Sequence, residues 1–295
     1  MSGLPIAVIG ASGQVAKALT KAAAERGQAI VVAGRPHVDL TDAKSVAAFL
    51  DWAQPSVVIN AAAYTAVDKA ETDQAAAIAL NAQGPARLAD WCASHGVPLI
   101  HISTDFVFDG HKTSPYCENF RRNPLSVYGQ TKSAGEDGVR VALDQHIIVR
   151  TAWVYGPDGS NFLKTMLRLG AERDVVRVIA DQTGTPTCAG DIAAALLDIA
   201  AQVDDKKQAA RWGTYHLVAG GETTWHGFAQ EIFEHAAKAG FKTPKLEAIP
   251  TADYPLPAKR PAYSVLDTAK IRDTFGIVLP PWQKGVAETV RLLAH

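Results

Sequence analysis

The chain has 295 residues, of which 47% are hydrophobic and 20% are charged, a composition typical of a globular protein. Its formal net charge of -1 provides no basic excess, so neither nucleic acid nor an anionic membrane is an expected partner. Cys92, Cys117 and Cys188 lack metal-ligand spacing, and no apolar run approaches the roughly 20 residues of a membrane span. The chain enters an apolar strand without a basic leader, and we expect a soluble cytoplasmic protein.

Apolar segments alternate with helical segments along the first half of the chain. Short runs rich in β-branched residues predict strands at 4–10, 29–34, 55–63, 97–103 and 146–156. Helices are predicted at 13–27 and 42–53, from about 71 to 95 with an interruption at Gly84 and Pro85, and around 125–136. Strands that alternate with helices predict an α/β fold with a parallel sheet covered on both faces.

The pattern loosens after about residue 155. Short strands are predicted at 175–179 and 214–218, and helices at 189–203 and 225–240. The segment PTADYPLPAKRP, residues 250–261, holds too many prolines for a regular central element. We interpret it as a long ordered loop near a site, and composition alone allows a surface linker almost equally.

The first predicted strand runs directly into the glycine-rich turn VIGASGQVA. Gly10 permits a tight turn, Gly13 lets the backbone approach a pyrophosphate, and small Ala16 lets the helix pack closely on the sheet. The helix N-terminus offers free N–H groups and the positive end of its dipole to phosphates. At the first strand-to-helix junction this pattern predicts dinucleotide binding, and the alternative is a tight corner without a ligand.

The second predicted strand ends in Gly34 and Arg35. A carboxylate at this strand end would bind the 2′-hydroxyl of NAD, whereas an arginine pairs with the 2′-phosphate of NADP. Arg35 therefore favours NADPH, with NADH as the second choice, and an exposed arginine without a ligand is the alternative. The DLTD run that follows would place Asp39 and Leu40 beside the adenine.

Tyr128 lies four residues before Lys132 in LSVYGQTKSAGE, so on a helix the two side chains share one face. An isolated phenol has a pKa of about 10, and a nearby ammonium would lower that pKa toward the range useful for proton transfer. A pair with this spacing is common by chance. Its significance therefore depends on what the neighbouring strands carry.

Two strand ends carry suitable neighbours for this pair. The predicted strand at 97–103 ends in Ser103 and continues into Thr104 and Asp105, and open α/β sheets bind ligands at the carboxyl ends of their strands. A hydroxyl there could hold a carbonyl oxygen that is about to receive a hydride. The alanine run 61–63 follows another strand and leaves room for a flat cofactor against the backbone.

Seven blocks occur in one order along the chain: the glycine turn, NAAAYTAVDKAE, STDFVFDG, YGQTK, RTAWVYG, DQTGTPT and YHLVAGGETTW. Together they resemble the extended short-chain dehydrogenase/reductases and, within them, the dTDP-4-dehydrorhamnose reductase family. The resemblance runs from about residue 4 to 293, although Ala16 stands where the family usually has glycine. It implies reduction of the C4 ketone of dTDP-4-dehydro-β-L-rhamnose to dTDP-L-rhamnose by NADPH or NADH, as part of dTDP-rhamnose biosynthesis.

The resemblance also implies a fold and a division into domains. We expect a Rossmann-type doubly wound parallel sheet with a smaller C-terminal substrate-binding domain. The NAD(P)-binding domain would span residues 1–152, and segments near 176–186 and 212–240 would return to it. The nucleotide-sugar-binding domain would span mainly residues 153–295.

Individual roles follow from the match to the family motifs. Tyr128 would donate the proton, Lys132 would bind the nicotinamide ribose and tune Tyr128, and Thr104 would polarise the C4 oxygen. The expected substrate contacts are Thr104, Asp105 and Tyr128, with Trp153 at the sugar or its diphosphate side and Arg260 at the diphosphate. With the residues named above, the expected cofactor-binding set is Gly10, Gly13, Gln14, Val15, Arg35, Asp39, Leu40, Ala61, Ala62, Ala63, Tyr64, Thr65, Tyr128 and Lys132.

Partners and competing functions stay open at this point. Some family members carry Mg²⁺ at a dimer interface, but no ligand set stands out here, so a metal and a homodimer are both undecided. The alternatives are a nucleotide-sugar epimerase or dehydratase, and a non-catalytic relative of the regulatory subunit of methionine adenosyltransferase. Dehydratases carry an acidic pair where TDFVF offers only Asp105, and intact Thr104, Tyr128 and Lys132 argue against a purely binding role.

Three further polar or aromatic features have simple interpretations. Asn81, in a helix beside the expected crevice, would support Lys132 through water or serve the fold alone. The DKAETD run, residues 68–73, would be a solvated helix entrance or hold a structural salt bridge. Trp225, Phe228 and Trp282 have helical spacing in the C-terminal part and are expected in the core.

Overall fold

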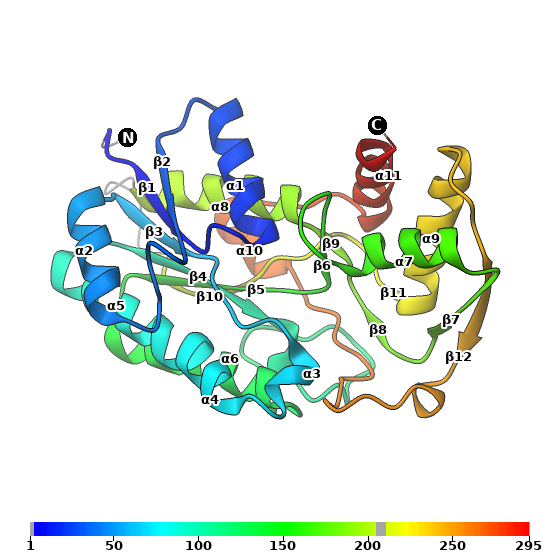
Figure 1. Ribbon diagram of the computed structural model, residues 1–295. Coiled ribbons are helices and arrows are strands. Elements are labelled where there is room, and N and C mark those ends of the chain that lie inside the picture. Colours follow the sequence, from blue (N-terminus) through cyan, green and yellow to red (C-terminus); the bar gives the residue numbers. More distant parts are fainter. Residues whose placement is uncertain (1–2, 205–210, 295) are drawn as a thin grey trace.

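A six-stranded parallel sheet forms the centre of the computed structural model, which describes residues 3–204 and 211–294 (Figure 1). Its strand order is β10-β5-β4-β3-β1-β2, and every neighbouring pair is parallel. The order reverses between β1 and β3, the point beside which open α/β sheets bind their ligands. The Rossmann-like doubly wound sheet predicted from the sequence is confirmed.

The elements follow the predicted alternation of strands and helices closely. The strands are β1 (Ile6–Ile9), β2 (Ile30–Ala33), β3 (Val57–Asn60), β4 (Leu99–Thr104), β5 (His146–Thr151), β6 (Val154–Tyr155), β7 (Val175–Ile179), β8 (Thr183–Gly184), β9 (Thr187–Cys188), β10 (Gly213–His216), β11 (Thr223–Thr224) and β12 (Lys245–Ile249). The helices are α1 (Gln14–Glu25), α2 (Ala43–Ala53), α3 (Val67–Ala70), α4 (Gln74–Ile78), α5 (Gly84–His95), α6 (Val127–Ala142), α7 (Phe162–Glu172), α8 (Ala189–Asp204), α9 (Trp225–Lys238), α10 (Ala269–Phe275) and α11 (Trp282–Leu293). Short π or 3-10 turns are η1 (Ala79–Gln83), η2 (Asp105–Val107) and η3 (Thr251–Asp253).

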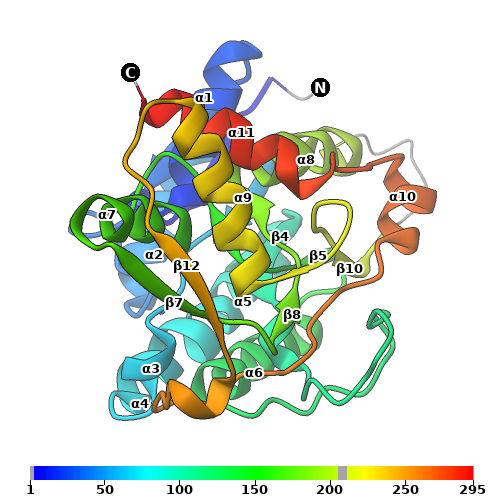
Figure 2. The same cartoon turned by 90° about the vertical axis from the view of Figure 1, so that its right-hand side faces the viewer.

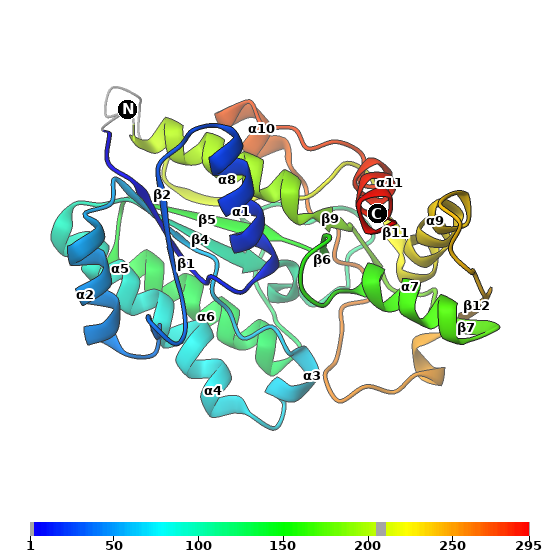
Figure 3. The ribbon, with the colours of Figure 1, turned by 45° about the horizontal axis from the view of Figure 1, so that its top comes forward.

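Helices cover both faces of the main sheet (Figures 1 and 3). Ile6 and Val8 of β1 belong to the core shared with α1, α8 and α10, whereas Ala7 and Ile9 belong to the core shared with α2, α5 and α6. Successive residues of a strand point to opposite faces of the sheet. Because helices cover both faces, all four side chains are at most 4% exposed. Burial on both faces explains why these strands read as continuous apolar runs.

The long helical stretch near residues 71–95 is not broken at Gly84 and Pro85. α4 passes through the π turn η1 into α5, and Pro85 lies in the first turn of α5. In a regular α-helix the proline ring would collide with the carbonyl of Asn81, four residues earlier. The wider π turn removes that collision, so the chain stays helical across the proline.

Later segments divide between the main sheet and a separate C-terminal part. β10 pairs with β5, and α8 packs in the core of the main sheet with α1. The segment 176–186 does not pair with this sheet, contrary to expectation, because β7 pairs with β12 (Figure 2). β7 buries only one of its faces, through Val176 and Val178, so it suits the edge of a small sheet rather than a layer covered on both sides.

The C-terminal part has a core of its own. α7, α9 and α11 pack there with β7 and β12, around side chains such as Tyr155, Phe228 and Trp282. Phe228 is therefore a core residue, as expected. Within residues 3–204 and 211–294 no helix is both long enough and apolar enough to cross a bilayer.

A buried ion network joins α6 to β5. Glu136 accepts hydrogen bonds from Arg150 Nε and Nη2 at 2.8 and 2.7 Å, from Arg140 Nη2 at 2.8 Å and from Ser103 Oγ at 2.6 Å. Burial alone would raise the pKa of Glu136, but hydrogen bonds and charges from Arg150, Ser103 and Arg140 outweigh it and lower the pKa to about 2. A carboxylate with a lowered pKa stabilises the folded state while it is ionised.

Glu136→Gln should lower the free energy of unfolding at pH 7 by about 3–5 kcal/mol, because Arg150 would stay buried without its partner. The folded-state pKa of about 2 lies below the ordinary value of 4.5. The contribution is therefore present above about pH 5 and is lost as the pH falls toward 2, so the stabilities of wild type and variant should converge over that range. Denaturant unfolding at a series of pH values measures both quantities.

The matched control is Asp137→Asn. Asp137 is the neighbouring carboxylate, it pairs with Arg122 and Arg140, and its side chain is 56% exposed. Exposed pairs contribute about 0–1 kcal/mol, so this variant should differ little from wild type. Equal stability of Glu136→Gln and wild type at pH 7 would show that the buried network does not stabilise the fold.

Candidate active site

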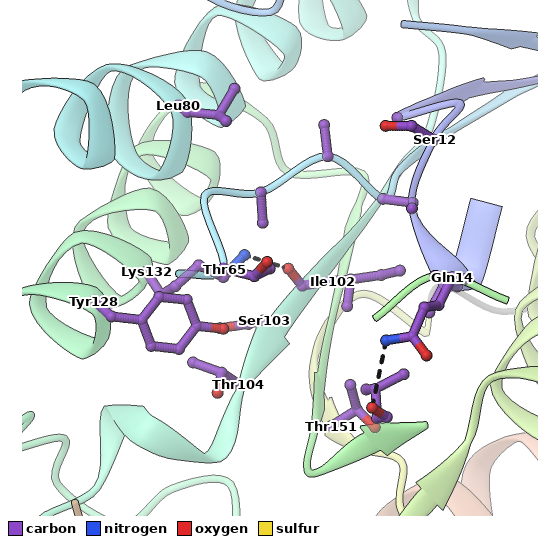
Figure 4. A pocket seen from close by; sticks show the side chains of 18 of the residues that line it. Ser12, Gln14, Thr65, Leu80, Ile102, Ser103, Thr104, Tyr128, Lys132 and Thr151 are labelled. Carbon is purple, nitrogen blue, oxygen red and sulfur yellow. Dashed lines mark hydrogen bonds between the residues drawn. The ribbon is translucent and has the colours of Figure 1, made fainter. Parts of the chain in front are cut away.

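A cavity of about 720 Å³ lies where β1, β3, β4 and β5 end (Figure 4). Its size suits a small-molecule or cofactor site. The predicted site residues that line it are Gly10, Gly13, Gln14, Val15, Arg35, Asp39, Leu40, Ala61, Ala62, Ala63, Thr65, Thr104, Asp105, Tyr128, Lys132, Trp153 and Arg260. The fold thus brings residues from both halves of the chain to one crevice, and of the predicted set only Tyr64 is left out.

The glycine turn forms one end of this cavity. Gly10 has φ +120°, and a Cβ there would lie 2.7 Å from the Ala62 nitrogen and 2.8 Å from the Ala61 carbonyl carbon. Only glycine fits this close approach. The N-cap residue of α1 is Gly13, which has no side chain to cap the helix. The first N–H groups of α1 therefore remain available to an anion. A dinucleotide pyrophosphate fits such a cradle.

Gln14 extends from the start of α1 toward the C-terminal part. Its Nε2 donates to the Val154 carbonyl at 3.5 Å, the dashed contact near Thr151 in Figure 4. Its Oε1 accepts a hydrogen bond from Asn161 Nδ2 at 2.9 Å. Asn161 is the N-cap residue of α7, so Gln14 ties the phosphate cradle to the segment that leads into α7.

The end of the cavity beside β2 carries one cation and one carboxylate. A Cβ at Gly34 would lie 2.8 Å from the Ala11 nitrogen, so no carboxylate side chain fits at that strand end. Arg35 is exposed and lines the cavity. Asp39 Oδ1 accepts bonds from Thr41 N and Oγ1, both at 2.8 Å, and these bonds, helped by the charge of Arg35, lower the pKa of Asp39.

Tyr64 does not line the cavity, although its neighbours in the chain do. Its hydroxyl donates to Asp73 Oδ2 at 3.0 Å, and its backbone N–H donates to Asn81 Oδ1 at 2.7 Å. Asn81 Nδ2 donates in turn to the Tyr64 carbonyl at 3.0 Å and to Thr131 Oγ1 at 3.2 Å. Asn81 therefore holds the backbone of the cofactor-lining segment, and the hydrogen bond to Asp73 turns the Tyr64 ring away from the cavity.

Helix α6 carries the predicted proton donor and the predicted lysine on the side that faces the cavity (Figure 4). Two glycines let this helix approach its neighbours. A Cβ on Gly129 would lie 2.3 Å from the Phe106 carbonyl oxygen, and a Cβ on Gly135 would lie 2.1 Å from the Asn81 carbonyl oxygen. The small residues of the segment around Tyr128 are thus required for packing.

Lys132 is 2% exposed and lies beside β4. Its Nζ donates to the Ile102 carbonyl at 2.6 Å. Burial lowers the pKa of Lys132 to about 8, and the charge of Glu136, one turn later, opposes that change. A lysine whose pKa lies this close to neutrality can lose its charge within the working range of an enzyme.

Tyr128 also lines the cavity and packs edge-on against Phe106, with ring centroids 5.6 Å apart. Burial raises the pKa of Tyr128 to about 12, and the Thr104 hydroxyl opposes this shift. The sequence-based expectation of a lowered pKa is therefore wrong in direction. Desolvation and the charge of Asp105 both raise the pKa, and Lys132 Nζ is directed to a backbone carbonyl, so the phenol keeps its proton at neutral pH.

Thr104 and Asp105 follow the predicted arrangement at the end of β4. The Thr104 hydroxyl donates to Asp105 Oδ1 at 3.0 Å and accepts a bond from Phe106 N at 3.2 Å. Asp105 is 1% exposed, and its Oδ2 has no partner that meets hydrogen-bond criteria in the described part of the chain. Burial raises the pKa of Asp105 to about 6, against the hydroxyls of Ser264 and Thr104. A desolvated carboxylate in the cavity wall fits a hydroxyl donor on a ligand.

Trp153 has φ +45°, a left-handed conformation that bulky residues rarely adopt. Its ring stacks on Trp225, with centroids 3.5 Å apart and planes inclined by 7°. Gly184 makes room for this ring, because a Cβ there would lie 2.5 Å from it. Both tryptophans line the cavity, and Trp225, which helical spacing assigned to the core, also packs against the core of the C-terminal part as expected.

Sequence reasoning also missed Thr151 as a cavity residue, and it did not foresee that the Ser103 hydroxyl bonds to Glu136. Thr151 ends β5, is paired in register with Thr104, and its buried Oγ1 has no partner among the described residues. The rule about strand ends could have identified it. Ser103 lines the cavity, and its hydroxyl donates to Glu136 Oε1 at 2.6 Å.

Arg260 reaches the cavity from the 250–261 segment, which is therefore an ordered loop at the site. It pairs with Asp68 at 2.8 Å, so the 68–73 run holds a structural salt bridge. Among the described residues, no group of three or more His, Cys, Asp or Glu side chains is placed to bind a metal ion.

Comparison with known proteins agrees with this geometry. Residues 4–294 match the family model described as RmlD substrate binding domain. The dTDP-4-dehydrorhamnose reductase of Sinorhizobium fredii is 44% identical over 285 residues, which cover 97% of this chain and 96% of that protein.

The crystal structure of the reductase from Clostridium acetobutylicum has a TM-score of 0.92 at 37% identity, and the match covers 99% of this chain and 100% of that one. The Bacillus anthracis reductase in complex with NADP has a TM-score of 0.91 at 31% identity, covering 98% of this chain and 99% of its own. The chain belongs to the RmlD family of dTDP-4-dehydrorhamnose reductases.

Proposed function

We propose that this protein reduces the C4 ketone of dTDP-4-dehydro-β-L-rhamnose to dTDP-L-rhamnose with NADPH. One observation carries the proposal: Tyr128, Lys132 and Thr104 meet in a cavity whose far end is a glycine cradle for a pyrophosphate. The relatives matched at 40–44% identity over almost their whole length carry the name of this reductase. In the reaction, the nicotinamide of the bound cofactor supplies a hydride to C4.

Tyr128 supplies the proton that balances this step. As hydride reaches C4, the carbonyl oxygen gains charge and takes the proton of the Tyr128 hydroxyl, which leaves an alcohol and a phenolate. The raised pKa of Tyr128 keeps the phenol protonated at neutral pH, so it is ready as a donor. Thr104 lies beside it, and its hydroxyl, which donates to Asp105 Oδ1 in the structure, would turn its proton to the carbonyl oxygen and hold it in place. Solvent restores the proton between turnovers.

Lys132 binds the nicotinamide ribose. Its Nζ uses one N–H on the Ile102 carbonyl, and an ammonium has two further donors for ribose hydroxyls. Its positive charge also stabilises the phenolate that Tyr128 becomes in the reaction. Lys132 therefore contributes to cofactor binding and to the chemical step.

Substrate recognition falls to the other wall of the cavity. Asp105 accepts a hydroxyl of the sugar, and Trp153, braced by Trp225, presents a flat surface to the sugar ring or its diphosphate side. Arg260 binds the diphosphate, since a guanidinium matches phosphate oxygens in pairs. Arg35 gives NADPH preference over NADH through the 2′-phosphate.

Two alternatives are less well supported. A dehydratase would need a second acidic residue after Asp105, where Phe106 stands. A purely binding relative would not need the phenol, ammonium and hydroxyl that line the cavity together. The direct test follows NADPH absorbance with purified protein and dTDP-4-keto-6-deoxy sugar, with and without the 3,5-epimerase. Oxidation that depends on the epimerase supports the proposal, whereas oxidation without it redirects the substrate assignment, and no oxidation contradicts reduction.

Tyr128→Phe should lower the turnover number by about 10²–10⁴, because it removes a positioned general acid and keeps the ring. The Kd for NADPH, measured by fluorescence, should stay close to that of wild type. Retention of more than about a tenth of wild-type turnover, with chemistry rate-limiting, would rule out Tyr128 as the proton donor.

Arg35→Asp should weaken NADPH binding by about 1–3 kcal/mol, the scale of a lost charge-assisted contact. NADH has no 2′-phosphate, so its Kd in the same variant is the internal control and should change little. Titration of both cofactors into both proteins measures the effect. Equal affinity of the wild type for NADPH and NADH would refute this role of Arg35.

The affinity for NADPH should fall as the pH rises through about 8, the pKa of Lys132, because the ammonium that binds the ribose loses its charge. Tyr128, with a pKa of about 12, should cause no loss of activity below about pH 10. Cofactor titrations from about pH 7 to 10 test the first point, and Lys132→Arg, which stays charged, should remove the pH dependence. An NADPH affinity that is constant over this range would contradict the role of Lys132.

A further inference from the structure

Arg260 and Asp68 form a two-point ion pair in the wall of the cavity. Arg260 Nη1 donates to Asp68 Oδ1 at 3.1 Å, and Nη2 donates to Oδ2 at 2.8 Å. Asp68 Oδ1 also accepts a bond from Ala258 N at 3.2 Å. The two side chains are 19% and 36% exposed, and the hydrogen bond from Arg260 lowers the pKa of Asp68. The pair therefore holds the guanidinium in one orientation.

The partners come from different parts of the molecule. Asp68 lies on α3, directly after the segment that lines the cofactor end of the cavity. Arg260 lies in the 250–261 loop, whose start is anchored in the C-terminal part, where Thr251 N donates to Asp181 at 2.9 Å. The loop, orange in Figure 1, passes beside α3, and the ion pair ties the two together.

The pair uses only one edge of the guanidinium. Arg260 Nη1 donates to Asp68 and to the Ala258 carbonyl, and Nη2 makes one bond to Asp68. In the described part of the chain, Nε and the second N–H of Nη2 have no partner. These two donors form the side edge of the guanidinium, which matches two phosphate oxygens. Arg260 lines the cavity, and the side edge is the part of its guanidinium that protein partners leave free for a ligand.

We propose that Asp68 is a positioning residue for the diphosphate of the sugar nucleotide. It fixes the end of the Arg260 guanidinium, so that the side edge faces the ligand before binding. This inference rests on the proposed function, in which Arg260 binds the diphosphate. Because Asp68 follows the cofactor-lining segment, the same contact also sets where the diphosphate lies relative to the cofactor end of the cavity.

If Asp68 instead competed with the diphosphate for Arg260, its removal would have the opposite effect on ligand affinity. A carboxylate that merely occupied Arg260 would have to be displaced by the diphosphate, and its removal would tighten binding. The geometry favours positioning, because Asp68 binds one edge of the guanidinium and leaves the other open. Preorganisation of a long side chain saves the ordering cost that binding would otherwise carry.

The probe for the test is dTDP, which carries the diphosphate without the sugar, titrated into the NADPH-saturated protein. Asp68→Asn keeps the size and shape of the side chain but replaces one carboxylate oxygen by an amide NH₂. Two N–H groups would then face each other, so the two-point pair with Arg260 is lost. The Kd for dTDP should rise roughly three- to tenfold, the scale of immobilising one rotamer-rich side chain. The Kd for NADPH and the melting temperature should change little. With the sugar nucleotide, KM should rise while kcat stays within about twofold.

A double-mutant cycle separates positioning from a general structural effect. In an Arg260→Ala background, Asp68→Asn should change the Kd for dTDP no further, because Asp68 acts through Arg260. Lys259→Gln is the matched control, since it removes an exposed cation from the adjacent loop position and should leave the Kd unchanged. An unchanged or lower Kd in Asp68→Asn, or the same rise in the Arg260→Ala background, overturns the inference.

The outcome separates this inference from the proposed reduction. If the wild type reduces the sugar nucleotide but Asp68→Asn leaves the affinity for dTDP unchanged, the inference alone fails. If the wild type binds dTDP and oxidises no NADPH with the keto sugar, the reduction fails while the effect of Asp68 on binding is still decided. A wild type that does not bind dTDP overturns the inference directly.

Discussion

The close approach of α6 to the end of β4 is the constraint on which the site depends. The Phe106 carbonyl lies where a side chain on Gly129 would be, and the Asn81 carbonyl lies where one on Gly135 would be. A larger residue at either position would push the helix outward and carry Tyr128 away from Thr104. The small residues around the phenol are therefore part of the catalytic geometry, because they set how deeply the phenol enters the crevice.

This close packing has an electrostatic consequence. Burial raises the pKa of Tyr128 to about 12 and lowers that of Lys132 to about 8, so at pH 7 the phenol is neutral while the lysine keeps its charge and loses it just above that pH. Glu136 lies one turn beyond Lys132 and remains ionised because Arg150 and Arg140 surround it. The same helix thus carries a neutral acid toward the cavity and a fixed anion toward the sheet. The state of Glu136 follows from its partners, because Arg150 and Arg140 keep this fully buried carboxylate ionised.

The cavity lies where the main sheet meets the C-terminal part, and polar contacts hold that junction. Gln14 bonds to Asn161 beside the glycine turn, and Asp68 bonds to Arg260 of the 250–261 loop. A cofactor would rest on the glycine cradle and a nucleotide sugar on the opposite wall, so the reacting atoms would meet between the two parts. Residues that join the parts therefore influence both binding steps, although they lie outside the reacting groups.

Sequence alone determined the alternation of strands and helices, the glycine cradle, and the strand end that carries Thr104 and Asp105, because these depend on residues close together along the chain. Only the tertiary structure decided which way side chains turn and how their pKa values shift. The Tyr64 ring turns to Asp73, the Ser103 hydroxyl to Glu136, and Trp225 faces the cavity beside Trp153. Likewise the partner of Arg260 lies 192 positions away. Burial and pairing of this kind arise when segments distant in sequence pack together, so the local spacing of residues cannot predict them.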